Sequence, residues 1–250
     1  MAGILYLIPN TLGQTEGEHG NPLASVIPED VQRITARLEY FVAENAKTAR
    51  AFLKLINASH PLTQTLQNIT IAELNVNTPA TALPDLLKPL LDGRDAGLVS
   101  EAGVPAVADP GANLVRLAHA HGIQVRPLVG PSSILLAVMS SGLNGQSFAF
   151  NGYLPINVDQ RTKRIKALDL RSRQENQTQL FIETPYRNAA LLEALSAHCQ
   201  SNTLISVATD LTLSTETIKT QTAARWKAAL GANKGPDFHK KPTVFLILGE

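Results

Sequence analysis

Short apolar runs alternate along about the first 130 residues with segments whose apolar side chains recur every three or four positions. The runs predict buried β-strands, and the recurring pattern predicts amphipathic α-helices. This alternation is typical of a mostly parallel sheet with helices on both faces. The expected strands are 3–8, 40–43, 69–74, 98–99 and 123–129, with helices following Pro28, Lys47, Pro79 and Gly111, and a further helix after Ser133.

The pattern changes near residue 145, where turn-forming residues precede a new apolar run from Phe148. We therefore expect two α/β domains, residues 1–145 and 146–250. The second should contain a mixed sheet, because its strands do not alternate regularly with helices. Its expected strands are 179–182, 204–208, 217–220 and 242–248, and its expected helices are 159–170, 188–197 and 222–230.

The stretch from Gly97 to Pro155 contains two transitions from strand through a small-residue turn to helix. With the turn after the first strand, these turns comprise residues 9–13, 100–105 and 130–133. Parallel strands end at one edge of a sheet, where small residues let the backbone approach a ligand closely. We expect a crevice that holds its ligand through main-chain groups, although ordinary strand-to-helix turns would show the same local pattern.

Three acidic residues should lie at the edge of this crevice: Glu44, Glu101 and Asp109. Asp109 precedes Pro110 and Gly111, so we expect it to cap the following helix. A polar segment, 14–27, is long for a connection inside a compact domain and predicts a flexible or functional excursion.

Composition predicts a soluble globular protein, since 44% of the residues are hydrophobic and 17% are charged. No apolar run approaches the roughly 20 residues that a membrane helix needs, so no membrane partner is expected. The single cysteine, Cys199, cannot form an intramolecular disulfide and fits a reducing compartment. With no secretory signal pattern at the N-terminus, the expected location is the cytoplasm.

The net charge of +1 gives no global attraction to nucleic acid, but the two parts of the chain differ. Residues 1–150 carry 9 Lys+Arg against 12 Asp+Glu, and residues 151–250 carry 13 against 9. Most of the excess should be a solvated helix face, while a polyanionic partner is the alternative. The positive residues concentrate at Arg161, Lys163, Arg164, Lys166, Arg171 and Arg173.

Several kinds of site are disfavoured by spacing. The histidines show no metal-binding spacing, and no metal is expected. Cys199 lies beside His198 on an expected helix, where adjacent side chains point apart, so an inert thiol is expected. Neither a phosphate-binding P-loop motif nor a dinucleotide-binding glycine motif is present.

Blocks in order along the chain resemble the tetrapyrrole methylase superfamily, the class III S-adenosylmethionine-dependent methyltransferases. Within it, the similarity is greatest to enzymes that methylate ribose 2′-hydroxyls of small-subunit ribosomal RNA. The matching blocks are 5–13, 42–44, 99–116, 127–133, 152–155, 181–187, 211–218 and the last strand.

The resemblance implies a homodimer of two-domain α/β subunits, with S-adenosylmethionine bound in a cleft between the domains. A carboxylate could accept the proton of a ribose hydroxyl, and the candidates are Glu44, Glu101 and Glu216. Cofactor contacts are implied at Leu12, Gly103, Val104, Val107, Ser132 and Ser133, and in the second half at Ile182, Ala208 and Thr243.

The chain departs from the ribosomal enzymes where a polyanionic substrate would be held. Where those enzymes have Ser-Asp-Ala-Gly-Thr-Pro, residues 100–105 of this chain have Glu101 and Val104 in place of the aspartate and the threonine. Residues 44–47 read Glu-Asn-Ala-Lys in place of their Glu-Asp-Thr-Arg. Residues 209–213 read Thr-Asp-Leu-Thr-Leu in place of their Arg-Glu-Leu-Thr-Lys. We therefore expect S-adenosylmethionine-dependent methyl transfer, with an RNA target that is changed or lost. The alternatives are a methylase of a tetrapyrrole or other small molecule, and a non-catalytic paralogue that binds S-adenosylmethionine.

Overall fold

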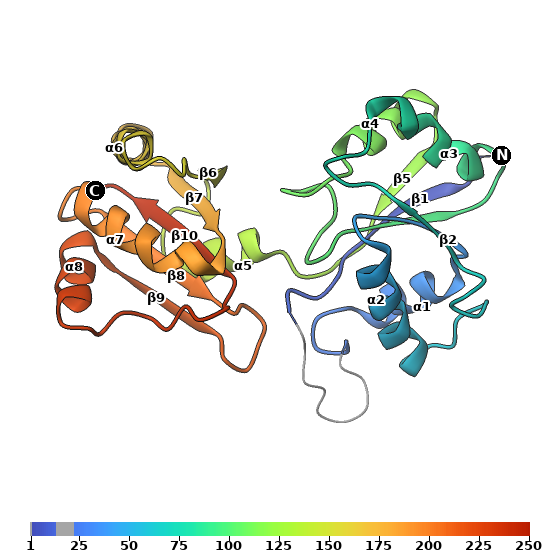
Figure 1. Cartoon of the computed structure of the whole chain (residues 1–250), viewed down its shortest axis with the longest axis horizontal. Helices are drawn as coiled ribbons and strands as arrows, with labels where there is room; N and C mark the ends of the chain where they lie inside the picture. Colours follow the sequence, from blue (N-terminus) through green and yellow to red (C-terminus); the bar gives the residue numbers. More distant parts are fainter. Residues whose placement is uncertain (1, 14–22) are drawn as a thin grey trace. The chain divides into compact units, whose positions relative to one another are not determined.

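The computed structural model describes residues 2–13 and 23–250, and it forms two compact units, Met1–Ser132 and Ser133–Glu250 (Figure 1). Each unit has its own sheet and its own hydrophobic core. Among the described residues, no helix is long and apolar enough to span a membrane.

The first unit is built on a five-stranded sheet in the order β3-β2-β4-β1-β5, and all its strand pairs are parallel. This confirms the predicted parallel sheet. Its strands are β1 (Ile4–Ile8), β2 (Tyr40–Ala43), β3 (Thr70–Glu73), β4 (Ala96–Val99) and β5 (Gln124–Pro127). Its helices are α1 (Glu29–Arg37), α2 (Ala46–Ser59), the short η1 (Ala80–Ala82), α3 (Leu83–Leu91) and α4 (Ala112–Ala120).

Helices cover both faces of this sheet because successive strand residues point to opposite sides. On one face, Ile8 and Phe41 pack in a cluster with residues of α1 and α2. On the other face, Leu5 and Leu98 pack with residues of α3 and α4. Leu23 and Ile27 are also buried in the first cluster, so the end of the predicted 14–27 excursion belongs to the core. Residues 14–22 lie outside the described residues.

The second unit contains a mixed five-stranded sheet in the order β6-β7-β10-β8-β9, as the sequence predicts. Only β6 and β7 are parallel, and the other pairs are antiparallel. Its strands are β6 (Phe148–Tyr153), β7 (Thr178–Glu183), β8 (Leu204–Thr209), β9 (Thr217–Thr222) and β10 (Thr243–Leu248). Its helices are α5 (Ser133–Ser141), α6 (Val158–Glu175), the short η2 (Pro185–Arg187), α7 (Asn188–His198) and α8 (Ala223–Gly231).

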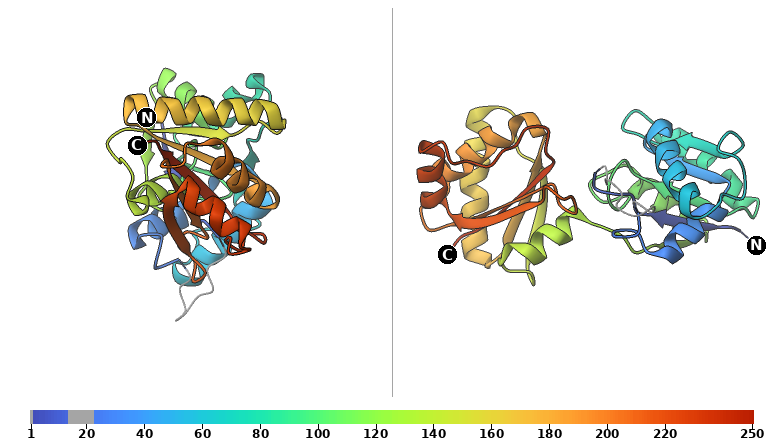
Figure 2. Two further views of the ribbon diagram at one scale, coloured as in Figure 1. Left: turned by 90° about the vertical axis from the view of Figure 1, so that its left-hand side faces the viewer. Right: turned by 90° about the horizontal axis from the view of Figure 1, so that it is seen from below.

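The core of the second unit lies between its sheet and α6, α7 and α8, where Phe181, Phe245 and Trp226 are fully buried. The Trp226 indole N–H donates to the Ile205 carbonyl, which satisfies its one polar group in the core. Figure 2 shows these helices around the sheet from two further directions, with α6 in gold.

Helix α5 packs against β8, β9 and β10 of the second sheet. The Thr220 hydroxyl donates to the Ser141 carbonyl at the end of this helix. We expected the first domain to extend to residue 145, whereas the two compact units divide between Ser132 and Ser133. The difference arises because the apolar residues of α5 cover the second sheet.

Candidate functional site

The loops that follow β1 and β4 lie at a topological switch point of the first sheet. The two strands are neighbours and end at paired residues, Ile8 and Val99. The chain then continues from β1 to α1 on one face and from β4 to α4 on the other. Loops that leave adjacent strands toward opposite faces separate at the carboxyl edge of the sheet, where open α/β sheets bind ligands.

Buried Asn10 joins these two loops. Its backbone N–H donates to the Gly103 carbonyl at 2.8 Å, and the Gly103 N–H donates to the Thr11 carbonyl at 3.3 Å. The Asn10 side-chain amide donates to the carbonyls of Ser100 and Glu101. The positions of the two loops are therefore coupled by backbone and side-chain bonds.

Gly103 brings a third loop into the same place. It has a φ of +67°, and a Cβ there would lie 3.1 Å from Leu12 Cδ2 and 3.6 Å from the Pro131 carbonyl oxygen. A larger residue would therefore meet both backbone strain and the Leu12 side chain. Three strand-end loops thus converge around a position without a side chain, as we expected from the small residues in each of them.

Three carboxylates gather at the same edge: Glu44, Glu101 and Asp109. The Glu44 N–H donates to the Val99 carbonyl, which places the end of β2 beside the end of β4. Glu101 is exposed and accepts a hydrogen bond from the Thr48 hydroxyl at 3.2 Å.

Burial and neighbouring charge raise the pKa of two of these carboxyls, Asp109 and Glu44. Burial, and then the nearby charges of Glu44 and Glu101, raises the pKa of Asp109 to about 6, against the lowering effect of a hydrogen bond with Ser100. Burial and the Glu101 charge also raise the pKa of Glu44 above its usual range. A carboxyl whose pKa approaches the working pH is suited to accept a proton during a reaction.

Asp109 is not the helix cap that its sequence context predicts. The N-cap position of α4 is Gly111, and no side chain caps that helix. The backbone between Gly103 and Gly111 turns sharply, with φ of +64° at both Ala106 and Ala108. Non-glycine residues in this conformation are costly and tend to occur at functional sites. This turn returns Asp109 to Ser100 instead of leaving it at the helix start.

The remaining candidates of the first unit lie on the same loops. Val104 is half-buried directly after Gly103, and Val107 is 48% exposed in the sharply turned segment. Ser132 ends the unit, and Ser133, the first residue of α5, begins the next one.

Three candidates of the second unit are brought together at one end of its sheet. Val244 of β10 pairs with Ile182 on one side and with Ala208 on the other, and Thr243 directly precedes it. The Thr243 hydroxyl is buried and accepts a hydrogen bond from the Asn188 amide.

Glu216 also belongs to the second unit, where its carboxylate accepts a hydrogen bond from the Thr212 N–H at 2.8 Å. That contact fixes the turn before β9, in which Asp210 and Thr212 have positive φ. The structure therefore groups Glu44 and Glu101 with Asp109, and gives Glu216 a bond within its own turn.

Other expectations concern metals and thiols. Within residues 2–13 and 23–250, no group of three His, Cys, Asp or Glu side chains is arranged to hold a metal ion. Burial raises the pKa of the Cys199 thiol, and the nearby Asp169 charge raises it further. Cys199 is therefore a poor nucleophile, in agreement with its predicted inertness.

The sequence profile described as Tetrapyrrole (Corrin/Porphyrin) Methylases matches residues 27–226. The chain belongs to this family. The match includes the carboxylate group and the loops after β4 and β5. It confirms the resemblance that the motifs indicated and identifies the chain as a methyltransferase of the tetrapyrrole methylase family.

Several relatives share the name Ribosomal RNA small subunit methyltransferase I. The protein of Xylella fastidiosa is 32% identical over 216 residues, which cover 86% of this chain and 74% of the relative. The protein of Haemophilus influenzae is 26% identical over 250 residues, which cover 100% of this chain and 80% of that protein. A third, from Mesorhizobium japonicum, is 38% identical over 139 residues, covering 56% of this chain and 46% of that protein.

Solved structures of tetrapyrrole methylases share the fold. The methyltransferase CobJ superposes with a TM-score of 0.60 over 99% of this chain and 95% of CobJ, at 18% identity. The uroporphyrin-III-C-methyltransferase of Thermus thermophilus superposes with a TM-score of 0.53 over 99% of this chain and 93% of that enzyme, also at 18% identity. At this identity the likeness establishes the two-sheet α/β architecture and leaves the substrate open.

The sequence did not indicate the role of Asn10, and it placed Asp109 at the crevice edge but assigned it to a helix cap. The linking role of Asn10 depends on carbonyls about 90 positions away in the sequence, so no local pattern reveals it. The role of Asp109 was hidden because an acid before Pro-Gly resembles a helix cap.

Proposed function

We propose that this chain transfers a methyl group from S-adenosylmethionine to a ribose 2′-hydroxyl of small-subunit ribosomal RNA. The proposal rests chiefly on one juxtaposition: a main-chain-lined site around Gly103 lies at the same sheet edge as Glu44, Glu101 and Asp109. The relatives named for ribosomal RNA methylation support the acceptor class. A site of this kind combines close approach to a nucleoside with a group able to take up a proton.

The residues of the first unit are suitable for the methyl donor. S-adenosylmethionine carries a methyl group already activated by its sulfonium, so the protein mainly needs to position it. A side chain at position 103 would fill space beside Leu12 and the Pro131 carbonyl, and that space is left free by glycine. The residues proposed to hold the donor are Leu12, Gly103, Val104, Val107 and Ser132, together with Ser133, Ile182, Ala208 and Thr243 of the second unit.

The carboxylates are proposed to manage the acceptor's proton. Methylation of a hydroxyl forms an oxygen–carbon bond and releases the hydroxyl proton, which must move to a base. We assign this role to Asp109, because burial and then the charges of Glu44 and Glu101 raise its pKa to about 6. Glu216 is a weaker candidate because its carboxylate already accepts the Thr212 N–H.

The nucleotide that accepts the methyl group is proposed to differ from that of the ribosomal enzymes. Glu101 replaces their aspartate, and its longer side chain accepts the Thr48 hydroxyl. In the segment that replaces Arg-Glu-Leu-Thr-Lys, Asp210 is buried and accepts a hydrogen bond from Thr215. These substitutions change the charge and the polar contacts of loops that are proposed to face the acceptor.

The test is transfer of labelled methyl from S-adenosylmethionine into small ribosomal subunits from a strain that lacks the resident enzyme. Label in ribose of the RNA supports the proposal, and the nucleotide is then located by primer extension. Modification of the same nucleotide as in the ribosomal enzymes would refute the changed target. Label only in a porphyrinoid or other small molecule would support the alternative substrate class, and donor binding without transfer to any pool would indicate a non-catalytic paralogue.

A further inference from the structure

Helix α6 carries six cationic side chains, and two of them form ion pairs with carboxylates. Near its end, Arg171 forms an ion pair with Glu175 at 3.0 Å, and Arg173 pairs with Asp169 at 3.2 Å. In the part of the chain that the structure describes, no carboxylate lies within ion-pair distance of the four cations in the first half of the helix. These four are Arg161, Lys163, Arg164 and Lys166.

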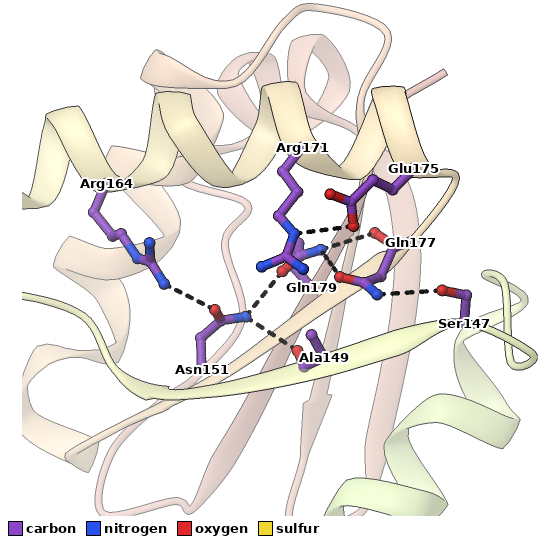
Figure 3. A network of polar contacts seen from close by, with 8 residues as sticks. All are labelled: Ser147, Ala149, Asn151, Arg164, Arg171, Glu175, Gln177 and Gln179. Carbon is purple, nitrogen blue, oxygen red and sulfur yellow. Dashed lines mark hydrogen bonds and ion pairs between the residues drawn. The ribbon is translucent and has the colours of Figure 1, made fainter.

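One of these cations is held in a defined orientation. Figure 3 shows Arg164 pointing from α6 toward β6, where its guanidinium donates to the Asn151 side-chain oxygen at 3.1 Å. The Asn151 amide in turn donates to the buried Gln179 side chain and to the Ala149 carbonyl. Because Arg164 is anchored through a neutral partner, its positive charge is not compensated.

Apolar and aromatic side chains are exposed in the segment that leads into these cations. Tyr153, at the end of β6, is 59% exposed, Ile156 in the connection to α6 is 72% exposed, and Val158, the first residue of α6, is 62% exposed. Asn157 caps the helix by accepting the Gln160 N–H, so the connection has a fixed conformation. Exposed aromatic rings and unpaired cations are the groups with which proteins bind bases and phosphates of single-stranded nucleic acid, and here they follow one another within residues 153–166.

We propose that residues 153–166, the β6–α6 surface, bind the phosphate backbone of RNA. The proposal rests on the proposed function in one respect, that the RNA carries the methyl acceptor. Charge complementarity favours RNA, since four uncompensated cations lie within six residues of a chain whose net charge is only +1. This surface would contribute affinity and orientation, while the carboxylate group of the first unit would act on the acceptor.

The test compares two triple variants of the full chain. In the first, Arg161→Gln, Lys163→Gln and Lys166→Gln remove charges from the β6–α6 surface and leave the Arg164–Asn151 bond intact. In the control, Arg225→Gln, Lys227→Gln and Lys234→Gln remove the same charge from exposed positions elsewhere in the second unit. Binding of a fluorescent single-stranded RNA is measured by anisotropy at several salt concentrations, after circular dichroism has established that both variants are folded.

We expect the surface variant to bind RNA at least tenfold more weakly at about 0.1 M salt. The slope of log affinity against log salt should become shallower by about 2, at roughly 0.7 per lost phosphate contact. The control should change the slope by less than half as much. Equal losses in both variants, or no RNA binding by the wild-type chain at low salt, would overturn the proposal.

A kinetic readout separates this surface from the proposed function. If the wild-type chain methylates RNA, the surface variant should raise KM for RNA while kcat stays within about twofold. If the wild-type chain binds RNA through this surface but transfers no methyl group, the proposed function fails and the RNA surface stands. If methylation proceeds with an unchanged KM in the surface variant, the RNA surface fails and the proposed function stands.

Discussion

Asp109 occupies an environment that disfavours its charged form. Its carboxyl is partly buried next to Glu44 and Glu101, and these surroundings raise its pKa to about 6. The turn that carries it contains two alanines with positive φ. Backbone strain and a destabilised charge at the same place are the kind of cost that a protein retains when the site has a task.

Asp109→Asn should therefore increase stability at neutral pH. The folded-state pKa lies above the usual value near 3.8, so folding favours the protonated carboxyl, and stability is lost as pH rises from about 4 through 6. Asparagine avoids that loss. After allowance for solvent screening, the gain should be about 1 kcal/mol at pH 8, falling toward zero below pH 4. Urea unfolding at both pH values measures it, and a larger gain at acid pH would contradict the assignment.

The same substitution should abolish most methyl transfer. Removing a positioned base costs about 10²–10⁴-fold in rate, so kcat should fall to that extent. Asp92→Asn, which alters an exposed acid after α3, serves as the control and should leave kcat unchanged. Wild-type kcat should rise with pH around 6, as a property of the coupled carboxylates. Full activity of the Asp109 variant would eliminate this residue as the base.

At the scale of elements, the decisive feature is the link between the loops after β1 and β4. Asn10 is 4% exposed, and its side-chain amide supplies two hydrogen bonds to the β4 loop in addition to the backbone bonds between the loops. Loss of that amide leaves the Ser100 and Glu101 carbonyls without this donor. Because the two loops diverge toward opposite faces of the sheet, we expect the link to matter for ligand binding as well as for stability.

Asn10→Ala should lower the free energy of unfolding by about 2 kcal/mol, since buried partners lose their hydrogen bonds. It should also weaken binding of S-adenosylmethionine. Asn157→Ala removes the cap of α6 and should cost about 1 kcal/mol without affecting donor binding. Urea unfolding combined with calorimetric titration distinguishes the two. Equal donor affinity in both variants would show that the link is only structural.

Regular elements were predictable because their hydrophobic periodicity is local. The strands Ile4–Ile8 and Thr243–Leu248, for example, correspond to apolar runs in the sequence. Helix α5 was harder to assign to a domain, because its apolar residues do not indicate which of the two sheets the helix packs against. At the site, the small residues located Gly103, whereas the surroundings of Asp109 depend on residues far apart in the sequence.

At the scale of the whole molecule, two units with separate cores each carry part of the proposed donor site. Leu12 and Gly103 belong to the first unit, and Ile182, Ala208 and Thr243 belong to the second. A ligand that binds only the folded state stabilises whichever unit it contacts. The expectation that both sets contact one ligand can therefore be tested through stability.

Scanning calorimetry with S-adenosylmethionine at about 100 times its Kd should show stabilisation by about 2.7 kcal/mol. If the donor contacts both units, the unfolding of both should shift upward, either as one transition or as two. The demethylated product should act similarly, and adenosine monophosphate serves as the control nucleotide. An upward shift confined to one of two transitions would exclude the other unit's residues from the donor site.

The central claim, that the methyl donor binds at the strand-end loops around Gly103, is tested most directly by calorimetric titration of two glycine variants. Gly103 and Gly122 have φ of +67° and +68°, but a Cβ at Gly122 would meet nothing within 4 Å. Gly103→Ala and Gly122→Ala therefore introduce similar backbone strain, and only the first adds a methyl group against Leu12. We predict that wild-type chain and Gly122→Ala bind S-adenosylmethionine with equal affinity, while Gly103→Ala binds at least tenfold more weakly. No heat of binding with the wild-type chain, or equal affinity in all three proteins, would contradict the claim.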